Sequence, residues 1–220
     1  MTGPRLKFCG LTDPADVPAA VLAGAAYIGF VFYAPSPRSV PLADAALMAA
    51  SVPAGICKVA LTVDASDADL DAILDAVPID MLQLHGRESP DRVARLRHRY
   101  GLPVMKAVGI ADEGDLPLLA EYGRVADQLL VDARPPRGAL PGGNGLRFDW
   151  RLIAGRRWPV PWMLAGGLHA GNVAQAMRLT GARQLDVSSG IETAPGVKDA
   201  AMMRNFADAA RAFDAVPSLD

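Results

Sequence analysis

The sequence is short of cysteine and has no excess of basic residues. Only two of its 220 residues are cysteines, Cys9 and Cys57, so a disulfide framework is excluded and a reducing compartment is favoured. Because 22 Lys and Arg are balanced by 24 Asp and Glu, the chain carries no positive field that would attract a nucleic acid. Residues 1–7 contain no apolar run of the kind that forms a signal peptide. We therefore expect a cytoplasmic protein with no nucleic-acid partner.

Charge is absent from one stretch long enough to span a bilayer, residues 17–37. Within it, Gly24 separates an Ala-rich half, residues 19–23, from an aromatic and β-branched half, residues 27–32. This division predicts a helix, a glycine stop and a buried strand instead of a membrane span. No membrane partner is expected.

Short apolar runs bounded by turn residues recur about every 26 residues, a spacing that suits one strand and one crossover helix. The eight predicted strands start near Arg5, Tyr27, Ile56, Met81, Val104, Gln128, Pro161 and Gln184. Most runs are apolar on both faces, as is typical of parallel strands that are covered on each side. Eight such units without a linker favour a single (β/α)₈ TIM barrel domain over residues 1–220, in preference to an open doubly wound sheet.

The segments between the predicted strands carry helix signals. Asp13 is predicted to cap a helix that has Pro14 at its first position, and Ser89 followed by Pro90 repeats this arrangement. The final segment has five apolar residues at helical spacing, which predicts a stripe that faces the core: Met202, Phe206, Ala209, Ala210 and Phe213.

In a TIM barrel the active site is built from the C-terminal ends of the strands and the loops that follow them. The reactive side chains predicted at these ends are Cys9, Arg38, His85, Lys106, Asp132 and Asp186. Gly166-Gly167 and Ser188–Gly190 follow the seventh and eighth predicted strands, where barrels often bind a sugar phosphate through backbone N–H groups. Either turn alone is common in loops, but the presence of both favours a phosphate site.

Six strand-end strings, in chain order, carry a family resemblance. They are KFCGLT from Lys7, GFVFY from Gly29 with SPR from Ser36, QLHG from Gln83, GGNG from Gly142 with FDW from Phe148, LAGGL from Leu164 with Asn172-Val173, and DVSSG from Asp186. Together they resemble the phosphoribosylanthranilate isomerase family from Arg5 to the final helix. The resemblance implies a barrel that performs the Amadori rearrangement of N-(5-phosphoribosyl)anthranilate to 1-(2-carboxyphenylamino)-1-deoxyribulose 5-phosphate in tryptophan biosynthesis.

The resemblance implies that Asp132 is the general acid and Cys9 the general base. The rearrangement needs an acid that protonates the ring oxygen and a base that takes the C2 proton, and the substrate supplies its own electron sink, so no cofactor or metal is expected. A free thiol is mostly protonated at pH 7, so Cys9 would have to be a thiolate stabilised by its surroundings. The plainer alternatives are an inert buried thiol, which also fits Cys57, and an Asx cap at Asp132.

The resemblance also implies the binding residues. It places the anthranilate carboxylate on Arg38, whose planar guanidinium suits a bidentate partner, although Arg38 could instead be solvated near Asp44. The other predicted substrate-binding residues are His85, Gly143, Asn144 and Asp186, and the predicted phosphate-binding residues are Gly166, Gly167, Ser188, Ser189 and Gly190. His85 could equally be a packed histidine, and Asp186 could tie the eighth strand to a neighbour.

Other functions stay open at this point. Lys106 could form a Schiff base in an aldolase, or it could pair with Asp132 or Asp186 in the barrel mouth. A sugar-phosphate isomerase of histidine biosynthesis would normally have a carboxylate in place of Cys9, and a non-catalytic barrel would not need both Cys9 and Asp132. The sequence departs from the family pattern at Asn144 and in the third strand.

A metal site is not expected, because Cys9, His85, Asp132 and Asp186 show no recognised ligand spacing. The expected partner is a small phosphoribosyl substrate, and the chain is expected to be a monomer or a homodimer.

Overall fold

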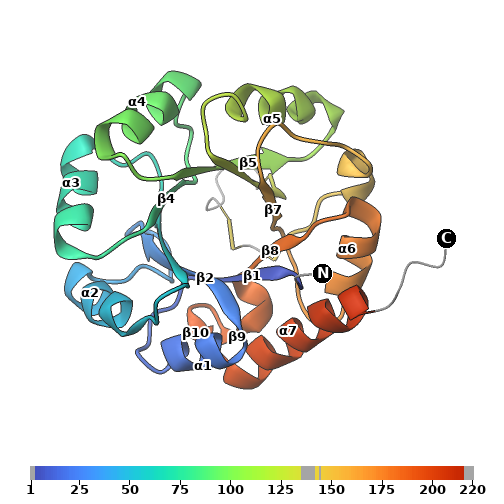
Figure 1. Ribbon diagram of the computed structural model, residues 1–220, viewed down its shortest axis with the longest axis horizontal. Coiled ribbons are helices and arrows are strands. Elements are labelled where there is room, and N and C mark those ends of the chain that lie inside the picture. Colours follow the sequence, from blue (N-terminus) through green and yellow to red (C-terminus); the bar gives the residue numbers. More distant parts are fainter. Residues whose placement is uncertain (1–2, 135–141, 144, 216–220) are drawn as a thin grey trace.

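The computed structural model describes residues 3–134, 142–143 and 145–215. Eight parallel strands close into a barrel in sequence order, each paired with the next and β8 with β1 (Figure 1). They are β1 Arg5–Cys9, β2 Ala25–Phe32, β3 Cys57–Thr62, β4 Met81–Leu84, β5 Val104–Ile110, β6 Gln128–Ala133, β7 Trp162–Leu164 and β8 Gln184–Val187. The predicted (β/α)₈ barrel is confirmed, and each strand begins within two residues of its predicted start.

Helices surround the barrel on the outside (Figure 1). They are α1 Asp16–Leu22, α2 Leu42–Ser51, α3 Asp67–Ala76, α4 Pro90–Tyr100, α5 Leu116–Tyr122, α6 Val173–Thr180 and α7 Ala200–Ala215, with 3₁₀ turns η1 Glu113–Asp115, η2 Trp150–Ile153 and η3 Ser189–Ile191. In the described part of the β6–β7 connection, η2 takes the place of a helix. A short hairpin that the sequence pattern did not predict, β9 Glu192–Ala194 with β10 Val197–Lys198, follows η3.

One of the two predicted helix starts is confirmed and the other is wrong. Ser89 caps α4 as predicted, because its hydroxyl accepts a hydrogen bond from the Arg92 N–H at 3.2 Å. By contrast, α1 begins only at Asp16 and not at Pro14. The Asp16 carboxylate accepts a hydrogen bond from the Asp13 N–H at 3.1 Å and holds the preceding residues in a turn, so the helix begins later than predicted.

Strand alternation divides the apolar side chains between two layers. Leu6 and Phe8 of β1 point outward to the helices, where Phe8 meets Phe206 of α7 edge to face at 6.4 Å between ring centroids. Inside the barrel a separate cluster plugs the N-terminal half, namely Tyr27, Val59, Met81, Met105, Ala107, Leu130, Met163 and Ala165. Among the described residues, the cavities that reach into the barrel lie toward its C-terminal strand ends.

The apolar stripe on α7 faces the core as predicted, but its centre is rotated slightly about the helix axis from the predicted position. Phe206 and Ala210 are fully buried together with Met203 and Ala207, whereas Met202, Ala209 and Phe213 lie at its edges and are partly buried. In the described part of the chain, no helix has the length and apolar character needed to cross a bilayer. The uncharged residues 17–37 are divided between α1, β2 and the following loop.

Candidate active site

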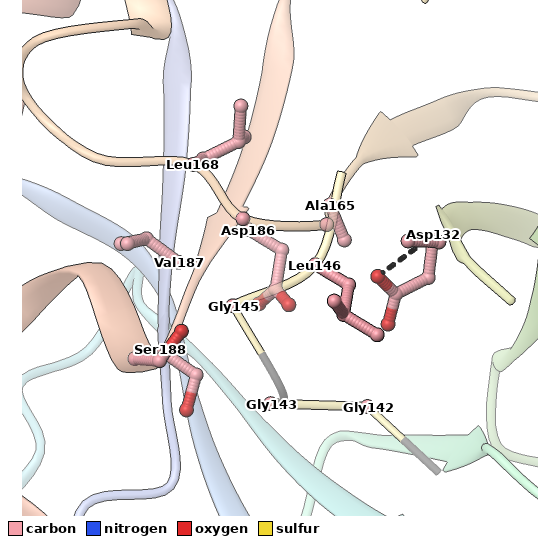
Figure 2. Close-up of a pocket in the computed structure, with 14 residues that line it drawn as sticks. Asp132, Gly142, Gly143, Gly145, Leu146, Ala165, Leu168, Asp186, Val187 and Ser188 are labelled. Atoms are coloured by element: carbon pink, nitrogen blue, oxygen red, sulfur yellow. Dashed lines mark hydrogen bonds between the residues drawn. The ribbon is translucent and has the colours of Figure 1, made fainter. Parts of the chain in front are cut away.

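Two adjoining cavities open at the C-terminal end of the barrel. The first, of about 400 Å³, is lined by the turns after β7 and β8, including Gly166, Gly167, Ser188 and Ser189. The second, of about 440 Å³, is lined by Cys9, Arg38 and His85 together with the apolar or aromatic side chains Val31, Tyr33, Leu61 and Val63. Asp132, Gly142, Gly143, Asp186 and Ser188 line both cavities. Figure 2 shows Asp132 and Asp186 reaching into the space beside Gly142 and Gly143.

Cys9 ends β1 and points into the barrel, where it is 3% exposed. It pairs in register with Gly29 of β2, and a Cβ at Gly29 would lie only 2.9 Å from Sγ. Burial raises the pKa of the Cys9 thiol, and the nearby ammonium groups of Lys7 and Lys198 offset this only in part. The site as it stands favours the thiol, which differs from the stabilised thiolate that the sequence led us to expect.

Asp132 lies at the C-terminal end of β6. One of its carboxylate oxygens is hydrogen-bonded to the backbone, and the other points toward His85. Oδ1 accepts a hydrogen bond from the Ala133 N–H at 2.7 Å, which fits the predicted local turn, and Oδ2 lies 3.4 Å from Nε2 of His85. The Nδ1 atom of His85 is 2.9 Å from the Nε2 amide of Gln83 on β4. The amide therefore donates to Nδ1 and leaves the imidazole proton on Nε2, facing Asp132. Sequence reasoning missed Gln83, although its inward position two residues before His85 was a signal.

Asp186 of β8 is bound to a lysine that sequence reasoning also missed. Lys7 pairs in register with Asp186, and its Nζ lies 2.7 Å from Oδ1 in a fully buried ion pair. The pair ties β8 to β1, as the sequence analysis foresaw for Asp186 as the alternative to substrate binding. Burial alone would lower the pKa of Lys7, but the charges and hydrogen bonds of Asp186 and Cys9 together outweigh it and raise that pKa.

Arg38, in the loop after β2, is buried and bound to Glu192 of β9. Its Nε donates to Oε1 at 2.8 Å and its Nη2 to Oε2 at 2.7 Å, while Nη2 also reaches the Gly143 carbonyl at 3.2 Å. Lys198 donates to the same carboxylate at 2.6 Å. Burial would raise the pKa of Glu192, but the two cations lower it. The alternative of a solvated Arg38 near Asp44 is wrong, because Glu192 binds the guanidinium inside the protein.

The glycine turn after β7 packs against Asp132. Gly166 and Gly167 have φ angles of +86° and +60°, and a Cβ at Gly166 would lie 3.1 Å from Oδ1 of Asp132. The side chain of Asn172 donates to the Gly167 carbonyl at 2.8 Å and fixes the turn. Glycine is therefore required both by the backbone conformation and by the close approach to Asp132.

The turn after β8 is held by hydrogen bonds to its neighbours. The Ser188 hydroxyl donates to the Cys9 carbonyl at 3.0 Å and accepts from Lys198 at 3.2 Å. Ser188 and Ser189 line the first cavity, whereas Gly190 packs so closely on the Leu168 carbonyl that a Cβ would not fit. Asn144, predicted to bind substrate, lies outside the described residues.

Comparison with known proteins identifies the family. The family model described as N-(5'phosphoribosyl)anthranilate (PRA) isomerase matches residues 6–209. The chain belongs to this family. The PRA isomerase of Cereibacter sphaeroides is 64% identical over 212 residues, which cover 96% of the chain and 100% of that relative.

Solved PRA isomerases also share the fold. The crystal structure of the PRA isomerase from Thermotoga maritima matches with a TM-score of 0.86 and 31% identity over 95% of the chain and 99% of its own length. A second crystal structure, of a PRA isomerase in complex with reduced 1-(o-carboxyphenylamino)-1-deoxyribulose 5-phosphate, matches with a TM-score of 0.83 and 30% identity over the same shares. The family indicated by the strand-end strings is confirmed.

Lys106 does not belong to the site of this PRA isomerase. It faces outward from the middle of β5, where its Nζ lies 2.8 Å from Oε2 of Glu88 and 2.7 Å from the Gly86 carbonyl. The foreseen ion pair with Asp132 or Asp186 is therefore wrong. Among the described residues, no lysine lines either cavity, so the aldolase alternative has no nucleophile there.

The second cysteine lies apart from the two cavities, and the candidate metal ligands do not form a metal site. Cys57 is the first residue of β3, at the opposite end of the barrel from Cys9, and both thiols are free. Burial raises the pKa of Cys57 to about 11. Within the described ranges, no three His, Cys, Asp or Glu side chains converge as metal ligands. What this PRA isomerase brings together is a carboxylic acid, a thiol, a bound arginine and two glycine-rich turns.

Proposed function

We propose that the chain converts N-(5-phosphoribosyl)anthranilate to 1-(2-carboxyphenylamino)-1-deoxyribulose 5-phosphate by acid–base catalysis, without a cofactor. The observation that carries this proposal is that two cavities of different character meet at Asp132. One is formed by glycine and serine turns that suit a phosphoribosyl group, and the other has apolar walls and a buried arginine that suit an aromatic carboxylate.

Asp132 is proposed as the general acid. Its carboxyl group donates a proton to the ring oxygen, the C1–O bond breaks, and the nitrogen lone pair forms a C1=N⁺ iminium. The position of Asp132 on the wall shared by both cavities supports this role, since the ring lies between the phosphate and the aromatic group. His85, 3.4 Å away, is proposed to orient the carboxyl group and to contact substrate.

Cys9 is proposed as the general base. Its thiolate takes the proton from C2, and the C–H electrons form the C1=C2 bond of an enaminol as the iminium nitrogen becomes neutral. The enaminol then becomes the ketone when the C2 hydroxyl loses its proton and C1 gains one. Because the cavity raises the pKa of the Cys9 thiol, the positive iminium that forms beside it would favour the thiolate when it is needed.

The binding roles follow the two cavities. Arg38 is proposed to bind the anthranilate carboxylate, with Gly143 beside it and Asn144 in the same loop. Asp186 lines both cavities and has one oxygen on Lys7, so its other oxygen is proposed to bind a ribose hydroxyl. The phosphate is assigned to the turns that contain Gly166, Gly167, Ser188, Ser189 and Gly190.

We also propose that one barrel domain performs the reaction in the cytoplasm, as a monomer or a homodimer. The two free thiols suit a reducing compartment. Light scattering on the purified protein measures the oligomeric state.

The test is anthranilate-ring fluorescence during turnover, with phosphoribosylanthranilate generated in situ. We expect a rapid fluorescence loss that Cys9→Ser and Asp132→Asn each slow about 10²-fold or more, the usual contribution of a positioned acid or base. Cys57→Ser is the matched control and should turn over like the parent, because Cys57 lies at the other end of the barrel. An inactive parent protein, or variants at positions 9 and 132 that keep full activity, would contradict the proposal.

A further inference from the structure

A fully buried ion pair inside the barrel has no part in the acid–base scheme above. Lys7 is 0% exposed and its Nζ lies 2.7 Å from Oδ1 of Asp186, which is itself 9% exposed. Placing two charges inside a protein is costly, and such a pair can often be replaced by apolar residues without loss of stability. The position of this pair therefore calls for an explanation other than stability.

The Lys7 ammonium lies beside the sulfur of Cys9. Both residues point inward from β1, two positions apart, and both pack against the position that a side chain at Gly29 would occupy. A Cβ at Gly29 would be 2.9 Å from Sγ of Cys9 and 3.2 Å from Nζ of Lys7. Glycine at this position leaves room for the two side chains to lie next to each other.

We infer that Lys7 is a positioning residue whose charge stabilises the Cys9 thiolate, while Asp186 holds the ammonium in place and limits its effect. This inference rests on the proposed role of Cys9 as the base. Lys7 acts through its charge and keeps its own proton, because the neighbouring negative groups hold its pKa above the usual lysine value despite burial. The C2 proton goes to Sγ and no proton passes to Lys7.

Other charged groups around Cys9 are less free to play this part. The titratable and charged groups near the sulfur are Lys7 and Asp186 from β1 and β8, Lys198 from β10, Arg38 and Tyr33 from the loop after β2, and His85 and Asp132 from the ends of β4 and β6. Lys198 and Arg38 share the single carboxylate of Glu192, which holds both cations in place and offsets only part of their positive charge. Among the charges that offset burial at Cys9, the contribution of Lys7 is the largest.

The structure offers a matched control for this lysine. Lys106 is also buried, 2% exposed, and also forms a 2.8 Å ion pair with a buried carboxylate, Glu88. It faces the helices and not the barrel interior. Lys7→Met and Lys106→Met therefore remove the same charge from equally buried pairs, and only the first should alter the ionisation of Cys9.

The experiment measures alkylation of Cys9 by iodoacetamide in a Cys57→Ser background, from about pH 7 to about pH 9, where the rate follows the thiolate fraction. We expect Lys7→Met to slow alkylation at least about tenfold at each pH, which corresponds to a pKa increase of about one unit. Asp186→Asn should accelerate it, and Lys106→Met should match the parent. Equal rates in Lys7→Met and the parent, or equal slowing in Lys7→Met and Lys106→Met, would overturn the inference.

A second comparison covers the case in which Lys7→Met does not fold because Asp186 is left unpaired. Lys7→Met/Asp186→Asn carries no buried charge at either position, and it should be alkylated at least about tenfold more slowly than Asp186→Asn alone. Equal rates in these two proteins would also overturn the inference. Alkylation needs no turnover, so its outcome is independent of whether the fluorescence assay shows isomerase activity.

Discussion

The Arg38 guanidinium and the Glu192 carboxylate form a two-point ion pair, with Nε 2.8 Å from Oε1 and Nη2 2.7 Å from Oε2. The arginine proposed to bind the substrate carboxylate is therefore held in place by a protein carboxylate before any ligand arrives. Within the described ranges, Nη1 is the guanidinium nitrogen without a protein hydrogen bond, and it is the atom nearest to a Cβ added at Gly143. Because Lys198 also binds Glu192, one carboxylate holds two cations in a buried network.

Glu192→Gln should destabilise the protein by about 3 kcal/mol, because it leaves two buried cations without a carboxylate. The side chains of Arg38 and Lys198 are 10% and 0% exposed, so solvent cannot replace the lost charge. Urea denaturation of the parent and the variant measures the change. The control is Asp149→Asn, which breaks an exposed pair with Arg151 and should leave the midpoint unchanged.

The same network gives a pH dependence with a defined sign. The pKa of Glu192 is lower in the folded protein than in the unfolded chain, so its stabilising contribution is present above the unfolded value of about 4.3 and is lost as the pH falls through the folded value. The stability of Glu192→Gln should therefore decrease less in acid than the stability of the parent does. A parent and variant with parallel acid unfolding curves would contradict this account.

Gly29→Ala should impair activity more than stability. The added Cβ would lie 2.9 Å from Sγ of Cys9 and would push the sulfur away from its present position. Overpacking of this kind costs about 1–3 kcal/mol in unfolding free energy, while a displacement of about 1 Å at a reacting group can cost about 10²-fold in rate. Gly3→Ala is the control, since a Cβ there meets no atom within 4 Å. Turnover in Gly29→Ala equal to that of Gly3→Ala would show that this packing does not position Cys9.

Gly142→Ala should reduce kcat/KM at least about tenfold, because a near-attack arrangement tolerates little displacement. Gly142 has a φ angle of +72°, and a Cβ would lie 2.8 Å from Nε2 of His85 and 3.5 Å from Oδ2 of Asp132. Gly155, with φ of +68° and no atom within 4 Å of an added Cβ, carries the same backbone strain without the crowding. Gly155→Ala should therefore lose only stability. Equal kcat/KM values in the two variants would contradict the crowding argument.

Much of the fold could be predicted from the sequence because the spacing of the strands and the residues at the strand ends carry local signals. The eight strands and the residues at their C-terminal ends follow from apolar runs and turn residues. The partners across the site could not be predicted in the same way. Lys7 and Asp186 are separated by 179 positions in the sequence, and Arg38 and Glu192 by 154. No local spacing therefore reveals either pair.

Lys106 shows why the direction of a side chain is difficult to predict in such a strand. Val104 and Val108 point outward with it, while Met105 and Ala107 point inward, and all four are apolar. A strand that is buried on both faces does not show which residues face the interior. In β1, Lys7 lies between the outward-facing Leu6 and Phe8 and points inward with Cys9.

The pH profile of kcat/KM provides the most direct test of the base. A base acts only when it is deprotonated, and burial raises the pKa of the Cys9 thiol above its ordinary value of about 8.5. The fraction of thiolate in the free enzyme therefore increases with pH throughout the neutral range. Because Asp132 must keep its proton in the same turnover, the test uses Asp132→Asn, in which the acid no longer titrates. Its residual kcat/KM should rise about tenfold per pH unit between about pH 6 and about pH 8, with no plateau before the ordinary thiol value.

Two variants identify the group that titrates. Cys9→Asp, in the same Asp132→Asn background, replaces the thiol with a carboxyl group, whose ordinary pKa is about 3.9, so the rising part of its profile should move to lower pH even if its maximal rate is small. Cys57→Ser should keep the parent profile, although burial raises the pKa of Cys57 to about 11, because that thiol lies at the other end of the barrel. If the profile is the same in this Cys9→Asp protein as in Asp132→Asn alone, the titrating group is another residue and Cys9 is not the base.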